Sequence, residues 1–140
     1  MKTYFFLIAS AFAVSSALAQ SQTFRQNNLW LEKQLNTLTH DKKDKSQNPV
    51  FSLKDCEADM KIKTNDEGFN FGMSFGTTLD AIEKVTYEKE KSNYTLRLVP
   101  YKSKENDNQY SFSLATDDEN LVKEIKRRLE ANIAECRKMK

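Results

Sequence analysis

The amino-acid sequence predicts an α+β fold: an N-terminal helix, an antiparallel sheet or partly open barrel of about six strands, and a C-terminal helix packed on the sheet. Near residue 30 and again after residue 118, apolar residues recur every three or four positions, which is the spacing of a helix. Between residues 50 and 114 the spacing changes to two, which is typical of half-buried strands. Polar turn sequences separate these strands, so hairpin connections are expected.

Residues 1–19 have the form of a secretory signal peptide. Lys2 is followed by an apolar run over residues 4–14, and Ala17 and Ala19 form the A-x-A pattern that a signal peptidase accepts. We expect cleavage after Ala19, which leaves a mature chain from Gln20. The alternative is an uncleaved membrane anchor, but the apolar run is shorter than the roughly 20 residues that a spanning helix needs.

The charge of the mature chain is nearly balanced. Without Lys2 the chain has 21 basic and 20 acidic residues, a net charge of +1. This balance gives no strong field for nucleic acid or for a membrane surface. We therefore expect an exported protein, periplasmic or secreted, with no nucleic-acid partner and no stable membrane insertion after removal of the signal. Residues 20–48 should form the N-terminal helix and a linker, and residues 49–140 the β domain with its C-terminal helix.

The N-terminal helix is predicted over Thr23–Thr39. Its apolar stripe, completed by Asn28, comprises Phe24, Leu31, Leu35 and Leu38. Leu29 and Trp30 lie beside this stripe, where they could dock on the sheet or on a partner. The charged segment over residues 40–48 contains no apolar residue, which indicates a linker or an exposed loop.

Alternating apolar residues place strands within residues 50–56, 58–64, 69–75, 79–91, 93–101 and 109–116, and the last two should form a hairpin. The C-terminal helix should start at a T-x-x-E capping box, with Thr116 as N-cap and Glu119 completing the box. We expect a core built from Phe51, Leu53, Ile62, Phe71, Met73, Phe75, Val85, Leu96, Leu98, Phe112, Leu114, Leu121, Ile125 and Leu129.

Cys56 and Cys136 are the only cysteines of the chain, and in an exported protein we expect them to pair. Cys136 falls on the apolar face of the last helix, so the bond would join that helix to an early strand. The alternatives are two free thiols or an intermolecular bond. One histidine far from both cysteines does not give the ligand spacing of a zinc site, and we predict no metal and no cofactor.

Residues 72–76 spell G-x-S-x-G, the sequence form of the nucleophile elbow of α/β-hydrolases. That elbow needs a serine at a tight strand-to-helix turn and a histidine later in the chain. Ser74 lies inside an alternating strand pattern, and the single histidine, His40, precedes it. We therefore expect no catalytic residue and predict that the protein is not an enzyme, since no motif selects a carboxylate pair either.

Basic residues supply a candidate partner surface. Lys61 and Lys63, together with the basic run Lys42, Lys43 and Lys45, could face an anionic partner. Basic and acidic residues alternate on the C-terminal helix, which indicates a solvated face. Asn93 begins the glycosylation sequon N-Y-T, which matters only in a eukaryotic source.

The segment from Thr77 to Ile133 resembles the pleckstrin-homology-like superfold. Leu79, Ile82 and Val85 form an L-x-x-I-x-x-V phrase at the entry to a strand, a hairpin follows, and an amphipathic helix ends the segment. The resemblance implies a curved sheet whose open end the helix plugs, and binding of phosphoinositides or peptides. The leading helix is extra to this superfold and equally suggests a cystatin-like or NTF2-like arrangement.

These observations together favour a non-catalytic, exported binding module for a protein, a peptide or a small apolar molecule. A small secreted hydrolase that uses unidentified carboxylates is the first alternative. An envelope-associated structural protein is the second, and self-association in solution would distinguish it.

Overall fold

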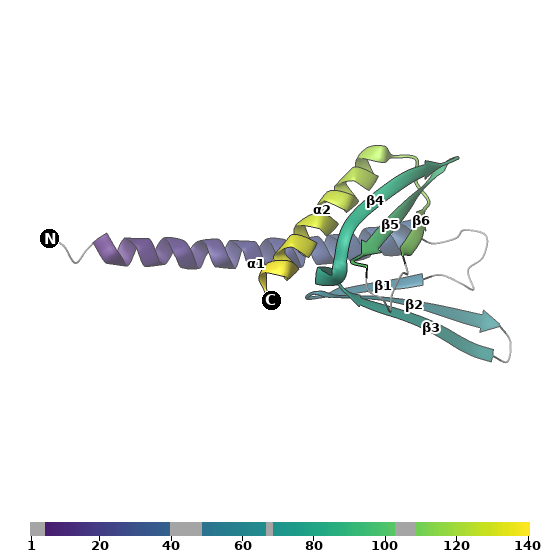
Figure 1. The fold of residues 1–140 in the computed structure, drawn as a ribbon, viewed down its shortest axis with the longest axis horizontal. Helices are drawn as coiled ribbons and strands as arrows, with labels where there is room; N and C mark the ends of the chain where they lie inside the picture. Colours follow the sequence, from purple (N-terminus) through teal and green to yellow (C-terminus); the bar gives the residue numbers. More distant parts are fainter. Residues whose placement is uncertain (1–4, 40–48, 67–68, 103–108) are drawn as a thin grey trace.

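The computed structural model describes the backbone of residues 5–39, 49–66, 69–102 and 109–140, and the side chains of residues 22–39, 49–61, 76–102 and 109–140. Helix α1 (Phe5–Leu38) is followed by strands β1 (Pro49–Lys54), β2 (Glu57–Asp66) and β3 (Phe69–Thr78). A short 3-10 helix, η2 (Leu79–Ala81), leads into strands β4 (Ile82–Glu90), β5 (Asn93–Pro100) and β6 (Tyr110–Leu114), and helix α2 (Glu119–Lys138) comes last (Figure 1). The predicted α+β class is confirmed.

The described strands form two antiparallel sheets of three strands, ordered β1-β2-β3 and β4-β5-β6. They replace the single sheet or partly open barrel that we expected, and they spread apart toward one end of the molecule (Figure 1). Two features account for the separation. The chain turns through η2 between β3 and β4, where Leu79 is buried. At the other side, α1 occupies the free edge of β1.

Three polar side chains of α1 bind the edge of β1 in a regular pattern, which we call the edge clamp. Asn36 pairs with both backbone groups of Phe51: its Oδ1 accepts from the N–H at 2.7 Å and its Nδ2 donates to the carbonyl at 3.1 Å. Glu32 accepts from the N–H of Leu53 at 3.0 Å. Asn28 donates to the carbonyl of Asp55 at 3.1 Å. The side chains of α1 thus stand where a neighbouring strand would otherwise pair.

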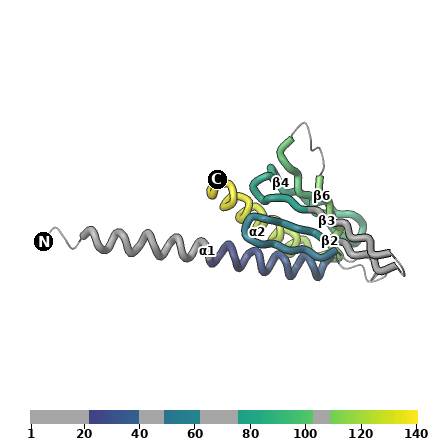
Figure 2. Tube along the Cα trace, turned by 90° about the horizontal axis from the view of Figure 1, so that it is seen from below, coloured from purple at the N-terminus to yellow at the C-terminus, as the bar shows by residue number. Residues whose placement is uncertain are grey.

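Helix α1 is longer than the predicted Thr23–Thr39, because it begins at Phe5 and runs without interruption to Leu38. Residues 5–20 contain no glycine or proline and are rich in alanine, so nothing in their sequence stops a helix. The second half of α1 runs alongside the sheets (Figure 2). Phe24, Leu31 and Leu35 are buried there, as the predicted stripe requires.

A buried asparagine network joins α1 to α2. Asn132 is 1% exposed, and its Nδ2 donates to Oδ1 of Asn28 at 2.8 Å and to the carbonyl of Phe24 at 3.2 Å. Nδ2 of Asn27 donates to Oδ1 of Asn132 at 3.1 Å. A buried amide without partners would destabilise the fold, so this pairing selects one relative position of the two helices.

Helix α2 buries the predicted face, but its cap differs from the prediction. Oδ1 of Asp118 accepts from the N–H of Leu121 at 3.2 Å, so Asp118 is the N-cap and the proposed capping box at Thr116 is wrong. The hydroxyl of Thr116 accepts from the N–H of Asp118 at 3.1 Å instead. This local turn uses the Thr116 hydroxyl two residues before the helix begins.

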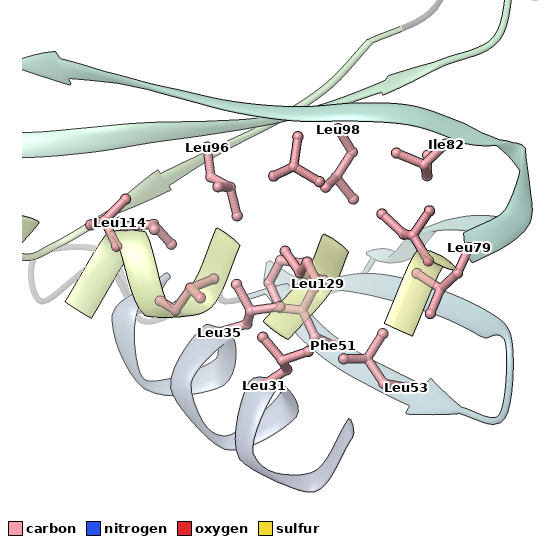
Figure 3. Packing of buried hydrophobic residues seen from close by; sticks show 14 of the residues in the cluster. Leu31, Leu35, Phe51, Leu53, Leu79, Ile82, Leu96, Leu98, Leu114 and Leu129 are labelled. Atoms are coloured by element: carbon pink, nitrogen blue, oxygen red, sulfur yellow. The ribbon is translucent and has the colours of Figure 1, made fainter. Parts of the chain in front are cut away.

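The core lies between the two sheets and the two helices. Leu31 and Leu35 from α1, Leu129 from α2 and Leu96 from β5 converge there (Figure 3). Of the predicted core residues, eight are buried: Phe51, Leu53, Val85, Leu96, Leu98, Leu114, Ile125 and Leu129. Phe112 and Leu121 are partly buried against the core. The other four predicted members, Ile62, Phe71, Met73 and Phe75, lie outside the residues whose side chains are described.

Replacement of Asn36 by alanine should lower the free energy of unfolding by about 2 kcal/mol, because both backbone groups of Phe51 lose their partner. Urea denaturation measures the change. Thr37→Ala is the matched control, since the Thr37 hydroxyl donates to the carbonyl of Lys33 within its own helix. An equal effect of the two substitutions would show that the edge clamp does not stabilise the fold.

Candidate functional site

Cys56 and Cys136 lie together at disulfide distance, with 2.18 Å between the sulfur atoms and 5.8 Å between the Cα atoms. Cys56 sits in the two-residue turn between β1 and β2, and Cys136 in the last turn of α2. The carbonyl of Cys56 also accepts from the N–H of Leu79 at 2.7 Å. The pair therefore ties the tip of the first hairpin to η2 and α2. The two cysteines are 80 positions apart in the sequence. A disulfide that closes a loop of this length stabilises a fold by about 4 kcal/mol in the chain-entropy account.

An apolar hollow lies between the two sheets. Its volume is about 40 Å³, which is far below the roughly 300 Å³ at which pockets for drug-sized molecules begin. Side chains of both helices, η2 and five strands line it: Leu35, Phe51, Leu53, Ala58, Asp59, Met60, Gly76, Thr77, Leu79, Leu96, Leu98, Tyr110, Phe112 and Leu129. A space of this size fits one compact apolar group rather than a whole ligand.

Aromatic and thioether side chains mark the less buried part of this hollow. Met60, Tyr110 and Phe112 are only partly buried. The rings of Phe51 and Phe112 meet edge to face with 4.9 Å between centroids, which joins β1 to β6 across the gap between the sheets. Among the described lining residues, Asp59 is the one charged group. The hollow can therefore hold an apolar group. Its described lining lacks the pair of facing carboxylates that a glycosidase uses.

The structure places the G-x-S-x-G sequence in a strand. Ser74 lies within β3, where its Cα partner is Lys61 of β2, so the strand-to-helix turn of a nucleophile elbow is absent there. The presence of glycine at position 76 is explained by its cross-strand neighbour. A Cβ at this position would stand 2.8 Å from Oδ1 of Asp59, its cross-strand partner, so glycine leaves room for that carboxylate.

The predicted partner residues are not brought together in the described part of the chain. Lys61 is exposed on β2. The side chain of Lys63, the basic run at residues 42–45 and His40 lie outside the described residues. Trp30 is partly buried against the core, and the guanidinium of Arg128 lies 4.3 Å from its ring centroid. These contacts within the protein account for Trp30, whereas its neighbour Leu29 is 70% exposed.

Two acidic residues at the start of α2 have structural partners. Asp118 caps α2, and Glu119 accepts from the hydroxyl of Tyr87 and pairs with Lys123. Burial and the contact with Glu119 raise the pKa of Tyr87. No group of three metal-ligating side chains occurs within the described residues.

Arg128 connects the surface of α2 to the buried asparagine network. Its Nε donates to Glu124 at 2.7 Å, and its Nη1 donates to Oδ1 of Asn27 at 3.3 Å. Arg127 pairs with the same carboxylate at 2.7 Å. Hydrogen bonds from Arg127 and then from Arg128 lower the pKa of Glu124 to about 2.

Sequence reasoning did not identify the polar residues that organise these contacts. Asn132 falls on the apolar face of α2, between Leu129 and Ile133, and Asn28 falls on the apolar stripe of α1. A polar residue at a buried position requires a partner. That signal was present in the sequence, but the identity of the partner was not.

Comparison of the chain with protein-family models, with curated protein sequences and with solved structures finds no match. Among the helices that the structure describes, none has the length and apolar character of a membrane-spanning segment.

The low pKa of Glu124 predicts a pH dependence. Its carboxylate stabilises the folded state above the unfolded pKa, and this contribution should be lost between about pH 5 and pH 2 as the group is protonated. Glu124→Gln should therefore lower stability at pH 7 and flatten the dependence over this window. Urea denaturation at several pH values measures the free energy of unfolding and its pH dependence. Glu130→Gln, at a looser pair with Lys126 (3.7 Å), is the control. Identical profiles for Glu124→Gln and the parent protein would contradict the assignment.

Proposed function

We propose that this chain is an exported, non-catalytic binding module that receives one apolar side chain of a protein or peptide partner. The observation that carries this proposal is the apolar hollow between the sheets, with Met60, Tyr110 and Phe112 partly exposed beside it. Its volume of about 40 Å³ favours a single side chain over an intact small molecule. The hydrolase and structural alternatives gain no comparable observation from the described residues.

Two features support export. The first 19 residues have the order of a signal peptide: a basic residue, an apolar run and an A-x-A site. The cysteine pair at disulfide distance suits an oxidising compartment.

The resemblance to the pleckstrin-homology-like superfold is also kept as a proposal. Leu79, Ile82 and Val85, which carry the resemblance, are all buried, at 1%, 0% and 2% exposure. They lead into the β4–β5 hairpin, and α2 packs against β4 and η2. In this superfold a peptide is one common class of ligand, which agrees with a partner that supplies a side chain.

The hollow should bind xenon, a single apolar atom that enters dry apolar cavities. In an NMR titration of the mature protein, the methyl signals of Leu35, Leu96 and Leu129 should shift with rising xenon pressure. Ala58→Leu should weaken this binding at least about tenfold, because the larger side chain fills the hollow. Ser52→Leu, on the exposed face of the neighbouring strand, should leave it unchanged. Equal titrations for all three proteins would disprove the hollow as a binding site.

Export predicts the covalent state of the protein. When the chain is exported through its own leader and left unreduced, its first residue should be Gln20. Its intact mass should be about 2 Da below that of the reduced chain, because the bond between Cys56 and Cys136 removes two hydrogens. Intact mass spectrometry before and after reduction measures both. A chain that retains Phe5, or two thiols that react with an alkylating reagent without reduction, would contradict this prediction.

A further inference from the structure

We propose that Asn93 carries an N-linked oligosaccharide, which is transferred to the chain before the second sheet forms. This inference rests on the export part of the proposed function, because the transfer takes place in the secretory pathway of eukaryotic cells. It therefore implies a eukaryotic source. Three observations support it: the sequence that begins at Asn93, the position of Asn93 in the fold, and the burial of Thr95.

The sequence Asn93-Tyr94-Thr95 has the form N-x-T, with a middle residue other than proline. No other asparagine of the chain is followed two positions later by serine or threonine. The chain thus has a single candidate acceptor. A sequon is used only on a chain that is exported, and the form of residues 1–19 and the cysteine pair at disulfide distance both support export.

Asn93 stands at the tip of the β4–β5 hairpin (Figure 1). It is the Cα partner of Glu90, so only Lys91 and Ser92 connect the two strands there. Both turn residues are exposed, and Asn93 itself is partly exposed. An oligosaccharide is bulky and strongly hydrated, so it needs a surface position of this kind.

The face of β5 that contains Asn93 is turned away from the hollow. Successive residues of a strand point to opposite faces, so Asn93 and Thr95 share one face and Leu96 lies on the other. Leu96 is fully buried and lines the hollow. On the outer face, Glu88 is the Cα partner of Thr95 and pairs with Arg97 at 3.1 Å. A sugar on Asn93 therefore leaves the core and the hollow free.

The burial of Thr95 indicates when the sugar is added. The site requires a hydroxyl residue two positions after the asparagine, so the transferase must reach Thr95 together with Asn93. In the folded protein Thr95 is 9% exposed, since Glu88 of β4 and Ser113 of β6 flank it as Cα partners. Strand β6 and Cys136 follow the site in the chain and enter the compartment after it. Transfer to the entering chain, before β6 pairs with β5, satisfies this requirement.

The transfer is a substitution at a sugar carbon. The donor is an oligosaccharide linked to a polyprenyl diphosphate. The side-chain nitrogen of Asn93 forms a bond to the anomeric carbon of the sugar, while the bond from that carbon to the diphosphate oxygen breaks. The nitrogen gives up one of its two protons, and the diphosphate leaves with the electron pair of the broken bond. No group is oxidised or reduced.

The test is translation of the full chain in the presence of microsomes from endoplasmic reticulum, which contain the donor. Protection from added protease and loss of the leader report export. A fall in mass on treatment with peptide N-glycosidase, together with conversion of Asn93 to aspartate, reports the sugar. We expect the translocated chain to carry one oligosaccharide. A translocated chain without sugar would overturn the proposal.

Three variants test the acceptor and the hydroxyl separately. Asn93→Gln and Thr95→Val should abolish the modification, and Thr95→Ser should retain it. The two variants at Thr95 keep the acceptor asparagine, so they compare a side chain that has the hydroxyl with one that lacks it. Because the sugar is added before folding, a variant that folds poorly still reports the transfer. Sugar on Thr95→Val at the level of the parent chain would contradict the assignment.

A second experiment tests the order of transfer and folding. The purified, unglycosylated and disulfide-bonded protein and the same protein after reduction and alkylation are each incubated with solubilised microsomes. The unfolded form should be modified at least about tenfold faster, because the folded form must first open the second sheet around Thr95. Equal rates would show that the folded site is accessible and would overturn the proposed order.

A second leader separates this inference from the proposed export. Residues 20–140 are placed behind an unrelated secretory leader and translated in the same way. If both chains are translocated and neither gains the sugar, export stands and the glycosylation site is wrong. If only the chain with the unrelated leader is translocated and gains the sugar, the acceptor sequence is functional, but the export and the native modification both fail. Xenon binding to the hollow is measured independently, since Asn93 lies on the outer face.

Discussion

The fold depends on a match between the residue spacing along helix α1 and the residue spacing along strand β1. Four residues of a helix advance about 6 Å, and two residues of a strand about 6.7 Å, so side chains four apart on a helix can meet backbone groups two apart on a strand. Asn28, Glu32 and Asn36 are spaced by four and bind Asp55, Leu53 and Phe51, which are spaced by two in the reverse direction. The match fixes α1 antiparallel to β1. Leu31 and Leu35, on the adjoining face of the helix, then point into the core (Figure 3).

The edge clamp has a consequence for the sheets. A strand edge that binds a helix cannot also pair with another strand, so β1 cannot close on β6. The remaining gap is filled by Phe51 and Phe112 at one point and by the leucines of the core around it, and the hollow is the space that they leave. The cysteine pair and the asparagine network act at other places, where α2 meets the first hairpin and where it crosses α1. Helix α2 is thus held to both α1 and the first sheet.

Much of this arrangement could be predicted from the sequence, because local periodicity reports which face of an element is buried. The buried face of β5 with Leu96 and Leu98 and the buried face of α2 follow from spacing. The approach of Cys136 to Cys56 follows from the predicted export and from the position of Cys136 on the apolar face of α2. The division into two sheets does not, since it depends on which element covers the edge of β1. Likewise, the start of α1 depends on residues 5–20 continuing a helix that the predicted signal boundary would have ended. The hollow was not predictable, because it is formed by residues from eight separate elements.

The same physical requirement explains both the closed and the open edges of this molecule. Backbone groups at a sheet edge need partners from a neighbouring element or from water. In β1 the partners are side chains spaced along α1, and in β4 charged residues keep the edge in water. The other two edge strands, β3 and β6, contain no charged residue, and each alternates apolar with small or polar residues. The edge strands thus meet this requirement in different ways, and the polar side chains of α1 at β1 are the way that also fixes the position of a helix.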